Sequence, residues 1–308
     1  MEIIVLGAGA IGSLCGAKLA GSNEVTLIGR AAHVAAINSH GLRIEGIESQ
    51  LVRIRATTAV EQIGADALIL LTTKVPGSAD ALAPVAPLVR DDTTVLCLQN
   101  GLGSERIARA ALGSRGIVLR GITQLGATFK SPGVIQYMAG GYTLIERHQR
   151  SDRVAEVLTA AGLDCRVSPN IAHDVWHKLV LNCVVNPITA ILGCEVGGIA
   201  NPRLDALKKL VIDECVAVAA TQGLIFEMDF LPQITEVFGP SRNIASMLQD
   251  LRRGRVTEID YLNAAVAALG AEHAVPCPVN EALTAIIKAM EERSRSLLPK
   301  KVLEPQPA

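Results

Sequence analysis

The stretch IIVLGAGAIG, residues 3–12, decides the fold. It opens as an apolar strand and continues as a helix, and between the two Gly7, Gly9 and Gly12 form the pattern GxGxxG. Gly7 permits a tight turn, Gly9 lets the backbone approach a pyrophosphate, and Gly12 lets helix and strand pack closely. At a strand-to-helix junction this pattern predicts a dinucleotide-binding turn, although a purely structural glycine-rich turn would have the same sequence.

The helix that begins in this turn would offer free N–H groups and a partial positive charge to phosphates. We therefore expect the whole turn to bind the dinucleotide, through Gly7, Ala8, Gly9, Ala10, Ile11 and Gly12. The next strand ends LIGR, residues 27–30, without the acid that usually holds the ribose 2′-hydroxyl of NAD. Arg30 can pair with a 2′-phosphate through its planar guanidinium, which favours NADP. The alternative is an ordinary surface arginine, and use of NADH alongside NADPH stays open.

Composition narrows the class of protein. The 308 residues, 49% of them hydrophobic, allow one large domain or two ordinary ones. A net charge of -1 argues against a nucleic acid or membrane partner. The seven cysteines include no CxxC pair, which suits free thiols in a reducing cytosol rather than disulfides or a metal site. Without a signal peptide or a continuous apolar run of about 18 residues, the chain is expected to be cytoplasmic.

Short apolar strands alternate with helices through the first half of the chain. Strands are expected at 3–7, 25–29, 66–74, 93–100 and 116–123, with two more within 133–146. Helices are expected from the glycine turn to about Ala20, up to Ser39, and at 79–89, 105–112 and 152–161. The segment 42–57 resembles an inserted antiparallel hairpin. Near-continuous apolar strands separated by helices predict an α/β fold with a Rossmann-like, doubly wound parallel sheet.

The pattern changes after Pro169, where the periodicity becomes helical to about Arg293. The predicted organisation is an NADP-binding Rossmann domain at 1–169 and an all-helical substrate and catalytic domain at 170–295. The polar, proline-containing tail at 296–308 is expected to be disordered. An apolar helical domain is also compatible with a homodimer.

Two polar residues follow strands of the predicted sheet. Lys74 ends LILLTTK, and Asn100 ends VLCLQN. Ligands of open parallel sheets bind at the carboxyl ends of the strands, so both side chains could reach a nicotinamide ribose or the substrate. Alternatively Lys74 is solvated and Asn100 forms an Asn-Gly turn.

A line of polar residues interrupts the apolar segment WHKLVLNCVVNP, residues 176–187. Lys178, Asn182 and Asn186 lie four residues apart, so on a helix they share one face over about 12 Å. A lysine held in an apolar setting can give a proton to a developing alkoxide, and the amides can bind a hydroxyl or a carboxylate. The alternatives are a solvent-facing stripe and structural bonds between helices.

A second segment, SRNIASMLQDLRRGRVTEIDYLN, covers residues 241–263. Ser246 is expected on an amphipathic helix that Gly254 interrupts. Thr257 is a candidate N-cap for the helix that follows, with Glu258 in its first turn. Without further evidence, Ser246 is equally a small packing residue, and Glu258 a surface acid that compensates the helix dipole.

Together these motifs resemble the ketopantoate reductase (2-dehydropantoate 2-reductase) family, over nearly the whole chain from Gly7 to about Lys288. The most specific pieces are LTTK, LQNG, WHKLVLNCVVNPITAILG and NIASMLQDLRRGRVTEIDYLN. The resemblance implies a Rossmann domain followed by a helical domain. It also implies NADPH-dependent reduction of ketopantoate to (R)-pantoate, on the route to pantothenate and coenzyme A, in a cleft between the domains.

The resemblance also implies roles for single residues. Lys178 corresponds to the catalytic acid, which also contacts the substrate. The other expected substrate contacts are Asn182, Asn186, Ser246, Glu258 and Asn100. Beyond the glycine turn, the positions that match cofactor contacts are Arg30, Lys74, Asn100 and Ala127.

One position departs from the family pattern. Many members have Asn-Gly where ILGCEVGGI, residues 191–199, places Val196, and that asparagine touches the substrate. Valine cannot form the hydrogen bond, so either a neighbour such as Asn201 replaces it or the substrate is another 2-keto acid. A related dehydrogenase of β-hydroxy acids stays a further alternative. So does a non-catalytic NADP sensor, although a sensor would need neither Lys178 nor Glu258.

Overall fold

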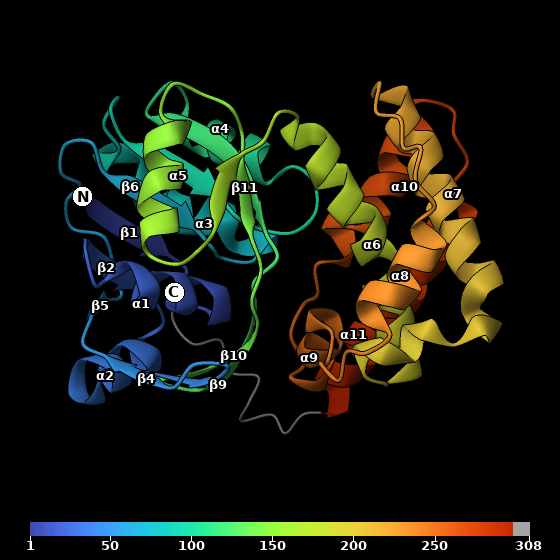
Figure 1. Cartoon of the computed structure of the whole chain (residues 1–308), viewed down its shortest axis with the longest axis horizontal. Coiled ribbons are helices and arrows are strands. Elements are labelled where there is room, and N and C mark those ends of the chain that lie inside the picture. The colour runs from blue at the N-terminus through green and yellow to red at the C-terminus, as the bar shows by residue number, and fades with distance from the viewer. Residues whose placement is uncertain (298–308) are drawn as a thin grey trace. The chain divides into compact units, whose positions relative to one another are not determined.

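A computed structural model describes residues 1–297 of the chain. The chain divides into two compact units, Met1–Asp174 and Val175–Ala308, which we call the N-terminal and C-terminal units. The predicted boundary near Pro169 lies just before this division. The elements of both units are labelled in Figure 1.

The N-terminal unit is built on an eight-stranded sheet in the order β12-β11-β8-β7-β6-β1-β2-β5. Its strands are β1 (Glu2–Leu6), β2 (Glu24–Ile28), β5 (Arg55–Thr57), β6 (Leu68–Leu71), β7 (Thr94–Cys97), β8 (Ile117–Thr123), β11 (Thr143–Ile145) and β12 (Cys165–Val167). Strands β5, β2, β1, β6, β7 and β8 run parallel to one another, and β11 runs antiparallel to β8. The chain adds strands on one side of β1 and then on the other, so the order reverses between β1 and β6. Ligands of doubly wound sheets bind outside the carboxyl ends of the strands at such a reversal.

Both faces of the sheet are buried, which explains its continuous apolar strands. On β1, Ile3 and Val5 pack into one core cluster, whereas Ile4 and Leu6 pack into another. The first cluster includes residues of α1 (Ala10–Leu19), α2 (Ala31–His40) and α5 (Ser151–Ala160). The second includes residues of α3 (Ser78–Leu82) and α4 (Ser104–Leu112). The predicted doubly wound α/β fold is therefore confirmed.

A second, four-stranded sheet has the order β4-β3-β10-β9. It consists of β3 (Leu42–Gly46), β4 (Gln50–Val52), β9 (Gly126–Ser131) and β10 (Val134–Ala139). The predicted hairpin exists as β3 and β4, but the end of that segment is β5, which pairs in parallel with β2 in the main sheet. Strands β9 and β12 were not predicted, because β9 is partly exposed and lacks alternation and β12 has only 3 residues.

The predicted helix at 79–89 is wrong in extent. Only α3 is α-helical there, and the 3₁₀ turns η1 (Val75–Gly77) and η2 (Ala86–Leu88) flank it. Pro84 and Pro87 have no backbone N–H group and their rings crowd the preceding turn, so two prolines this close together disfavour a continuous α-helix here.

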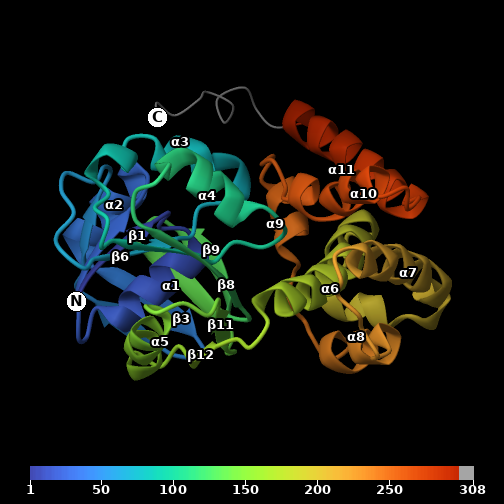
Figure 2. The ribbon, with the colours of Figure 1, turned by 90° about the horizontal axis from the view of Figure 1, so that it is seen from above.

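The described part of the C-terminal unit contains helices and no strand. Its α-helices are α6 (Ile171–Leu192, which begins in the N-terminal unit), α7 (Asp205–Thr221), α8 (Phe230–Phe238), α9 (Ser246–Arg252), α10 (Asn263–Glu272) and α11 (Pro278–Leu297). Its 3₁₀ helices are η3 (Val196–Ala200), η4 (Pro202–Leu204) and η5 (Ile259–Tyr261). Helices α10 and α11 pack side by side (Figure 2). Ser296 and Leu297 belong to α11, so the predicted disordered tail begins too early, and the rest of it lies outside the described residues.

Helix α6 is long and apolar enough to cross a membrane by length and composition alone. However, 72% of its most apolar window is buried inside the protein, which is typical of a core helix. Its buried side includes Leu179, Val180, Cys183 and Val184. The seven cysteines of the chain are all free, as predicted.

Candidate active site

The glycine turn is shaped by close packing at two of its three glycines. A Cβ atom on Gly7, whose φ is +111°, would lie 2.4 Å from the Thr73 nitrogen, and one on Gly12 would lie 2.3 Å from the Gly7 oxygen. By contrast, a Cβ on Gly9 would meet nothing closer than the Gly7 oxygen at 4.0 Å. The backbone beside Gly9 therefore borders open space, as a phosphate cradle requires.

The same turn leaves backbone donors free. Helix α1 begins at Ala10 without a side-chain cap, and its first intrahelical bond runs from the Ser13 N–H to the Gly9 oxygen at 2.9 Å. Within residues 1–297, the N–H groups of Ala10, Ile11 and Gly12 have no acceptor. Three unpaired donors at the positive end of a helix suit the phosphates of a dinucleotide.

The register of the sheet places Arg30 beside this turn. Leu6 pairs with Ile28, so β1 and β2 end together, and a Cβ on Gly29 would lie 3.0 Å from the Ala8 Cβ. Arg30 follows directly and is exposed. In the described part of the chain, its guanidinium has no ion pair or hydrogen bond, so it is available to an anionic ligand.

Lys74 and Asn100 lie at the same edge of the sheet. β6 and β7 are the next strands after β1, and both residues follow the carboxyl ends of these strands. The Thr72 hydroxyl donates to the Gly7 oxygen at 2.9 Å, which fastens the Lys74 loop to the glycine turn. Ala127 lies on β9, which packs against α1, the helix that begins at this turn. The N-terminal unit thus brings the glycine turn, Arg30, Lys74 and Asn100 to one edge of the main sheet, whereas Ala127 lies in the second sheet.

Two residues at this edge were missed by the sequence reasoning. Arg120 on β8 is 5% exposed, and its guanidinium donates to the carbonyls of Cys97, Gly121 and Gly101 at 3.2, 2.7 and 2.9 Å. Burial lowers the pKa of Arg120, and the Glu105 carboxylate opposes that shift. Gln99 donates to the Ser78 hydroxyl at 2.9 Å, while its buried Oε1 has no partner. The sequence signal for Arg120 is an arginine inside the apolar run GIVLRGIT, residues 116–123.

A hollow in the C-terminal unit brings together three of the predicted substrate residues. It is a narrow crevice whose side chains, as they lie in this structure, leave no room for a water molecule. Its lining comprises Asn186, Ser246, Met247, Asp250, Glu258 and Leu262. Asn186 comes from α6, Ser246 is the first residue of α9, and Glu258 immediately precedes η5. Glu258 was expected inside a helical turn and instead lies at the start of a 3₁₀ helix.

Polar groups in and beside this hollow lack protein partners. Glu258 and Asn186 are each 8% exposed, and neither side chain has a hydrogen bond or ion pair within the described residues. The Asn182 Nδ2 atom is buried and has no partner among residues 1–297. Buried polar groups are normally paired, so these side chains are available to a bound molecule.

The three polar residues of α6 lie on one face of the helix. Lys178 lies one turn before Asn182 and two turns before Asn186, which lines the hollow. Lys178 and Asn182 are partly buried and Asn186 is buried, whereas the opposite side of the helix packs into the core. This stripe is therefore not an ordinary solvent-facing surface.

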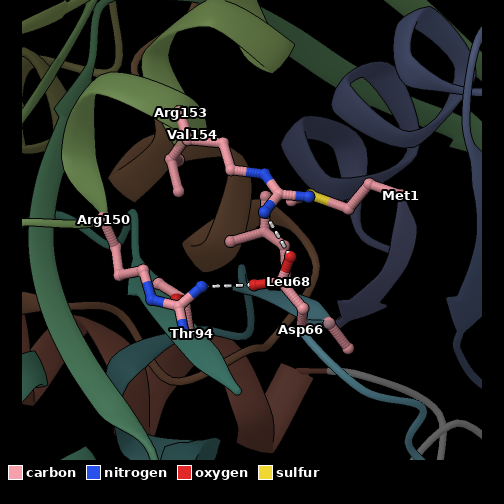
Figure 3. Close-up of a pocket in the computed structure, with 8 residues that line it drawn as sticks. Met1, Asp66, Leu68, Thr94, Arg150, Arg153 and Val154 are labelled. Atoms are coloured by element: carbon pink, nitrogen blue, oxygen red, sulfur yellow. Dashed lines mark hydrogen bonds and ion pairs between the residues drawn. The ribbon is translucent and has the colours of Figure 1, made fainter. Parts of the chain in front are cut away.

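A second hollow lies at the amino ends of the strands in the N-terminal unit, at the opposite edge from the glycine turn. In Figure 3 the side chains of Arg150 and Arg153 both point toward Asp66. Both arginines form ion pairs with the Asp66 carboxylate. Because both arginines already form ion pairs with Asp66, we interpret this cluster as structural: it attaches α5 to the sheet.

Comparison with known proteins agrees with this geometry. A doubly wound sheet with a GxGxxG turn at its carboxyl edge, followed by a helical unit, is typical of nicotinamide-dependent oxidoreductases. Residues 3–150 match the family described as Ketopantoate reductase PanE/ApbA, and residues 170–291 match its C-terminal domain. The chain belongs to the ketopantoate reductase family.

Relatives and solved structures support the same assignment. The chain is 40% identical to a 2-dehydropantoate 2-reductase of Pyrococcus horikoshii over 299 residues, which cover 94% of this chain and 98% of that protein. A PanE/ApbA family ketopantoate reductase from Ralstonia eutropha is similar with a TM-score of 0.89 and 30% identity, over 96% of this chain and all of that one. D-mandelate dehydrogenase in complex with NADH and anilino(oxo)acetate is similar with a TM-score of 0.88 and 27% identity, over 96% and 99% of the two chains.

Proposed function

We propose that the protein reduces the 2-keto group of ketopantoate to (R)-pantoate with NADPH, on the route to pantothenate and coenzyme A. The observation that carries this proposal is the hollow of the C-terminal unit. There a buried, unpaired carboxylate, Glu258, lies with Asn186 and Ser246 beside the face of α6 that carries Lys178. Family membership and the names of the relatives support the reaction.

The residues at the carboxyl edge of the N-terminal unit fit NADPH. The free N–H groups of Ala10, Ile11 and Gly12 would bind the pyrophosphate, and Arg30 would bind the 2′-phosphate. Lys74 and Asn100 would contact the nicotinamide ribose. When bound, NADPH supplies the hydride that the keto carbon accepts. The D-mandelate dehydrogenase structures contain NADH, so the preference for NADPH rests on Arg30 and on the missing acid after β2.

Lys178 acts on the oxygen of the keto group. Its ammonium stabilises the negative charge that grows there and donates the proton that completes the alcohol. The amide of Asn182, whose Nδ2 is free to donate, binds the substrate together with Asn186 and Ser246. Glu258 accepts a hydrogen bond from the hydroxyl of the substrate and so favours keto acids that carry one.

Steady-state assays of Lys178→Ala test this assignment. Loss of a general acid is expected to lower kcat by about 100- to 10,000-fold. The dissociation constant for NADPH, measured by fluorescence titration, is expected to stay nearly unchanged. Lys209→Ala is the matched control, because Lys209 is exposed and pairs with Asp213 on its own helix. A Lys178→Ala enzyme with normal turnover would refute the role of Lys178.

A reductase of another 2-keto acid is a second candidate. Asn201 cannot readily replace the family asparagine, because its side chain accepts the Arg203 N–H at 3.0 Å and caps η4. Val196 is buried, and its N–H donates to the Asn243 oxygen at 2.8 Å. The similarity to D-mandelate dehydrogenase also favours a substrate other than ketopantoate. A panel of 2-keto acids, each assayed with NADPH and with NADH, distinguishes the two candidates by kcat/KM.

A further inference from the structure

A buried carboxylate on α11 binds the segment that carries Glu258. Glu291 is 2% exposed, yet its Oε1 accepts hydrogen bonds from both the N–H and the hydroxyl of Thr257, each at 2.7 Å. Helix α11 also contacts η5 and α9, the elements next to Glu258 and Ser246. Glu291 itself does not line the hollow.

The charge of Glu291 is balanced from its own helix. Its Oε2 lies 3.7 Å from the Lys288 Nζ and 3.7 Å from the Arg295 Nη2. Lys288 also pairs with Asp260, two residues after Glu258. The Oε1 atom is therefore left for Thr257. Hydrogen bonds donated to a charged carboxylate are stronger than hydrogen bonds between neutral groups.

These bonds fix the backbone on both sides of Glu258. Thr257 is fully buried, and its hydroxyl also accepts the Ile259 N–H at 3.2 Å. The Glu258 carbonyl accepts the Tyr261 N–H at 2.9 Å. The Glu258 side chain has no partner of its own within the described residues, so its direction into the hollow is set by the backbone that Glu291 holds.

We propose that Glu291 is a positioning residue that sets the discrimination for hydroxyl-bearing keto acids by holding the Glu258 carboxylate at the substrate. This inference rests on the proposed function, because it takes Glu258 as the acceptor of the substrate hydroxyl. Glu291 touches neither the substrate nor the reacting atoms. Its loss should therefore affect the hydroxyl contact and spare the chemistry at the keto group.

The test compares two substrates that differ only in the hydroxyl group. Ketopantoate carries it, and trimethylpyruvate has hydrogen in its place. We expect Glu291→Ala to lower kcat/KM for ketopantoate by about tenfold or more, through KM. The value for trimethylpyruvate should stay within about twofold, as should KM for NADPH. The readout is the ratio of the two kcat/KM values, which a general loss of folded protein would not change.

Matched variants keep the test decisive. Glu291→Gln retains a carbonyl oxygen for Thr257 and should keep most of the ratio. Thr257→Val removes one of the two bonds and should give an intermediate ratio. Glu292→Ala, at the exposed neighbouring carboxylate of the same helix, should leave the ratio unchanged. Adding Glu291→Ala to Glu258→Ala should lower the ratio no further than Glu258→Ala alone.

The outcomes separate the inference from the proposed function. Wild-type turnover of both keto acids, with a ratio that falls in Glu291→Ala and in Thr257→Val, supports both, and Thr257→Val alone decides the matter if Glu291→Ala does not fold. A ratio that stays at the wild-type value in folded variants, or an equal loss on both substrates, overturns the positioning role alone. Absence of ketopantoate turnover in the wild type overturns the proposed function and the inference with it.

Discussion

Arg30 is the residue on which the choice of cofactor depends. It is exposed, follows the end of β2 beside Ala8, and has no ionic partner within the described residues. Arg30→Ala should raise KM for NADPH by about 10- to 100-fold, because a charged hydrogen bond to the 2′-phosphate is lost. KM for NADH, which lacks that phosphate, should change little. Arg43→Ala, at another exposed arginine of the unit, serves as the control. Equal shifts with both cofactors would contradict this role.

Asn186 could be predicted from its spacing with Lys178 and Asn182 on one helix face, whereas Ser246 and Glu258 gained a role only through the resemblance to the family. The structure brings Asn186, Ser246 and Glu258 to one hollow. Glu291 could not be identified in the same way. Its bonds to Thr257 join positions that only the packing of α11 brings together, and an acid on an amphipathic helix is normally a surface residue.

At the scale of elements, β8 braces the loop that follows β7. Arg120→Met would leave the carbonyls of Cys97, Gly101 and Gly121 without their donor in a buried site. We expect the free energy of unfolding to fall by about 3 kcal/mol, measured by denaturant titration followed by circular dichroism. Arg109→Met is the control, because Arg109 is half exposed and its pair with Glu146 spans 3.6 Å, so its loss should cost under about 1 kcal/mol. Equal losses of unfolding free energy in Arg120→Met and Arg109→Met would show that the burial of Arg120 does not increase its contribution to stability.

Elements were predictable where hydrophobic periodicity was strong. Strands β6 and β7 are buried along their whole length, and α6 is apolar on nearly every side but the polar stripe. The failures came from the weaker signals. Prolines divided the segment at 79–89, and β9 pairs across the second sheet without the alternation that identifies a strand. Which of the two sheets a strand joins depends on partners distant in sequence, as the separation of β5 from β3 and β4 shows.

At the scale of the whole molecule, acid stability should depend on His33 in the N-terminal unit. His33 is 3% exposed, its Nδ1 accepts the Gly133 N–H at 2.9 Å, and its Nε2 lies 3.1 Å from the Ser13 hydroxyl. The Gly133 N–H can only donate, so Nδ1 is unprotonated and the ring is neutral with its proton on Nε2. These bonds join α1, α2 and the turn between β9 and β10. A second proton would replace an acceptor with a donor that faces another donor.

Burial lowers the pKa of His33 from its ordinary value of 6.5, so the unfolded chain binds a proton before the folded chain does. The contribution of neutral His33 to stability is complete at pH values above 6.5, the ordinary pKa that the unfolded chain has. It is lost as the pH falls from that value through the lower pKa of the folded chain. The free energy of unfolding should therefore decline in wild type between about pH 7 and about pH 5 more steeply than in His33→Gln, which does not titrate. Denaturant titrations across this range measure the two slopes. Parallel slopes would mean that His33 contributes nothing to the acid response, whatever the substitution costs at neutral pH.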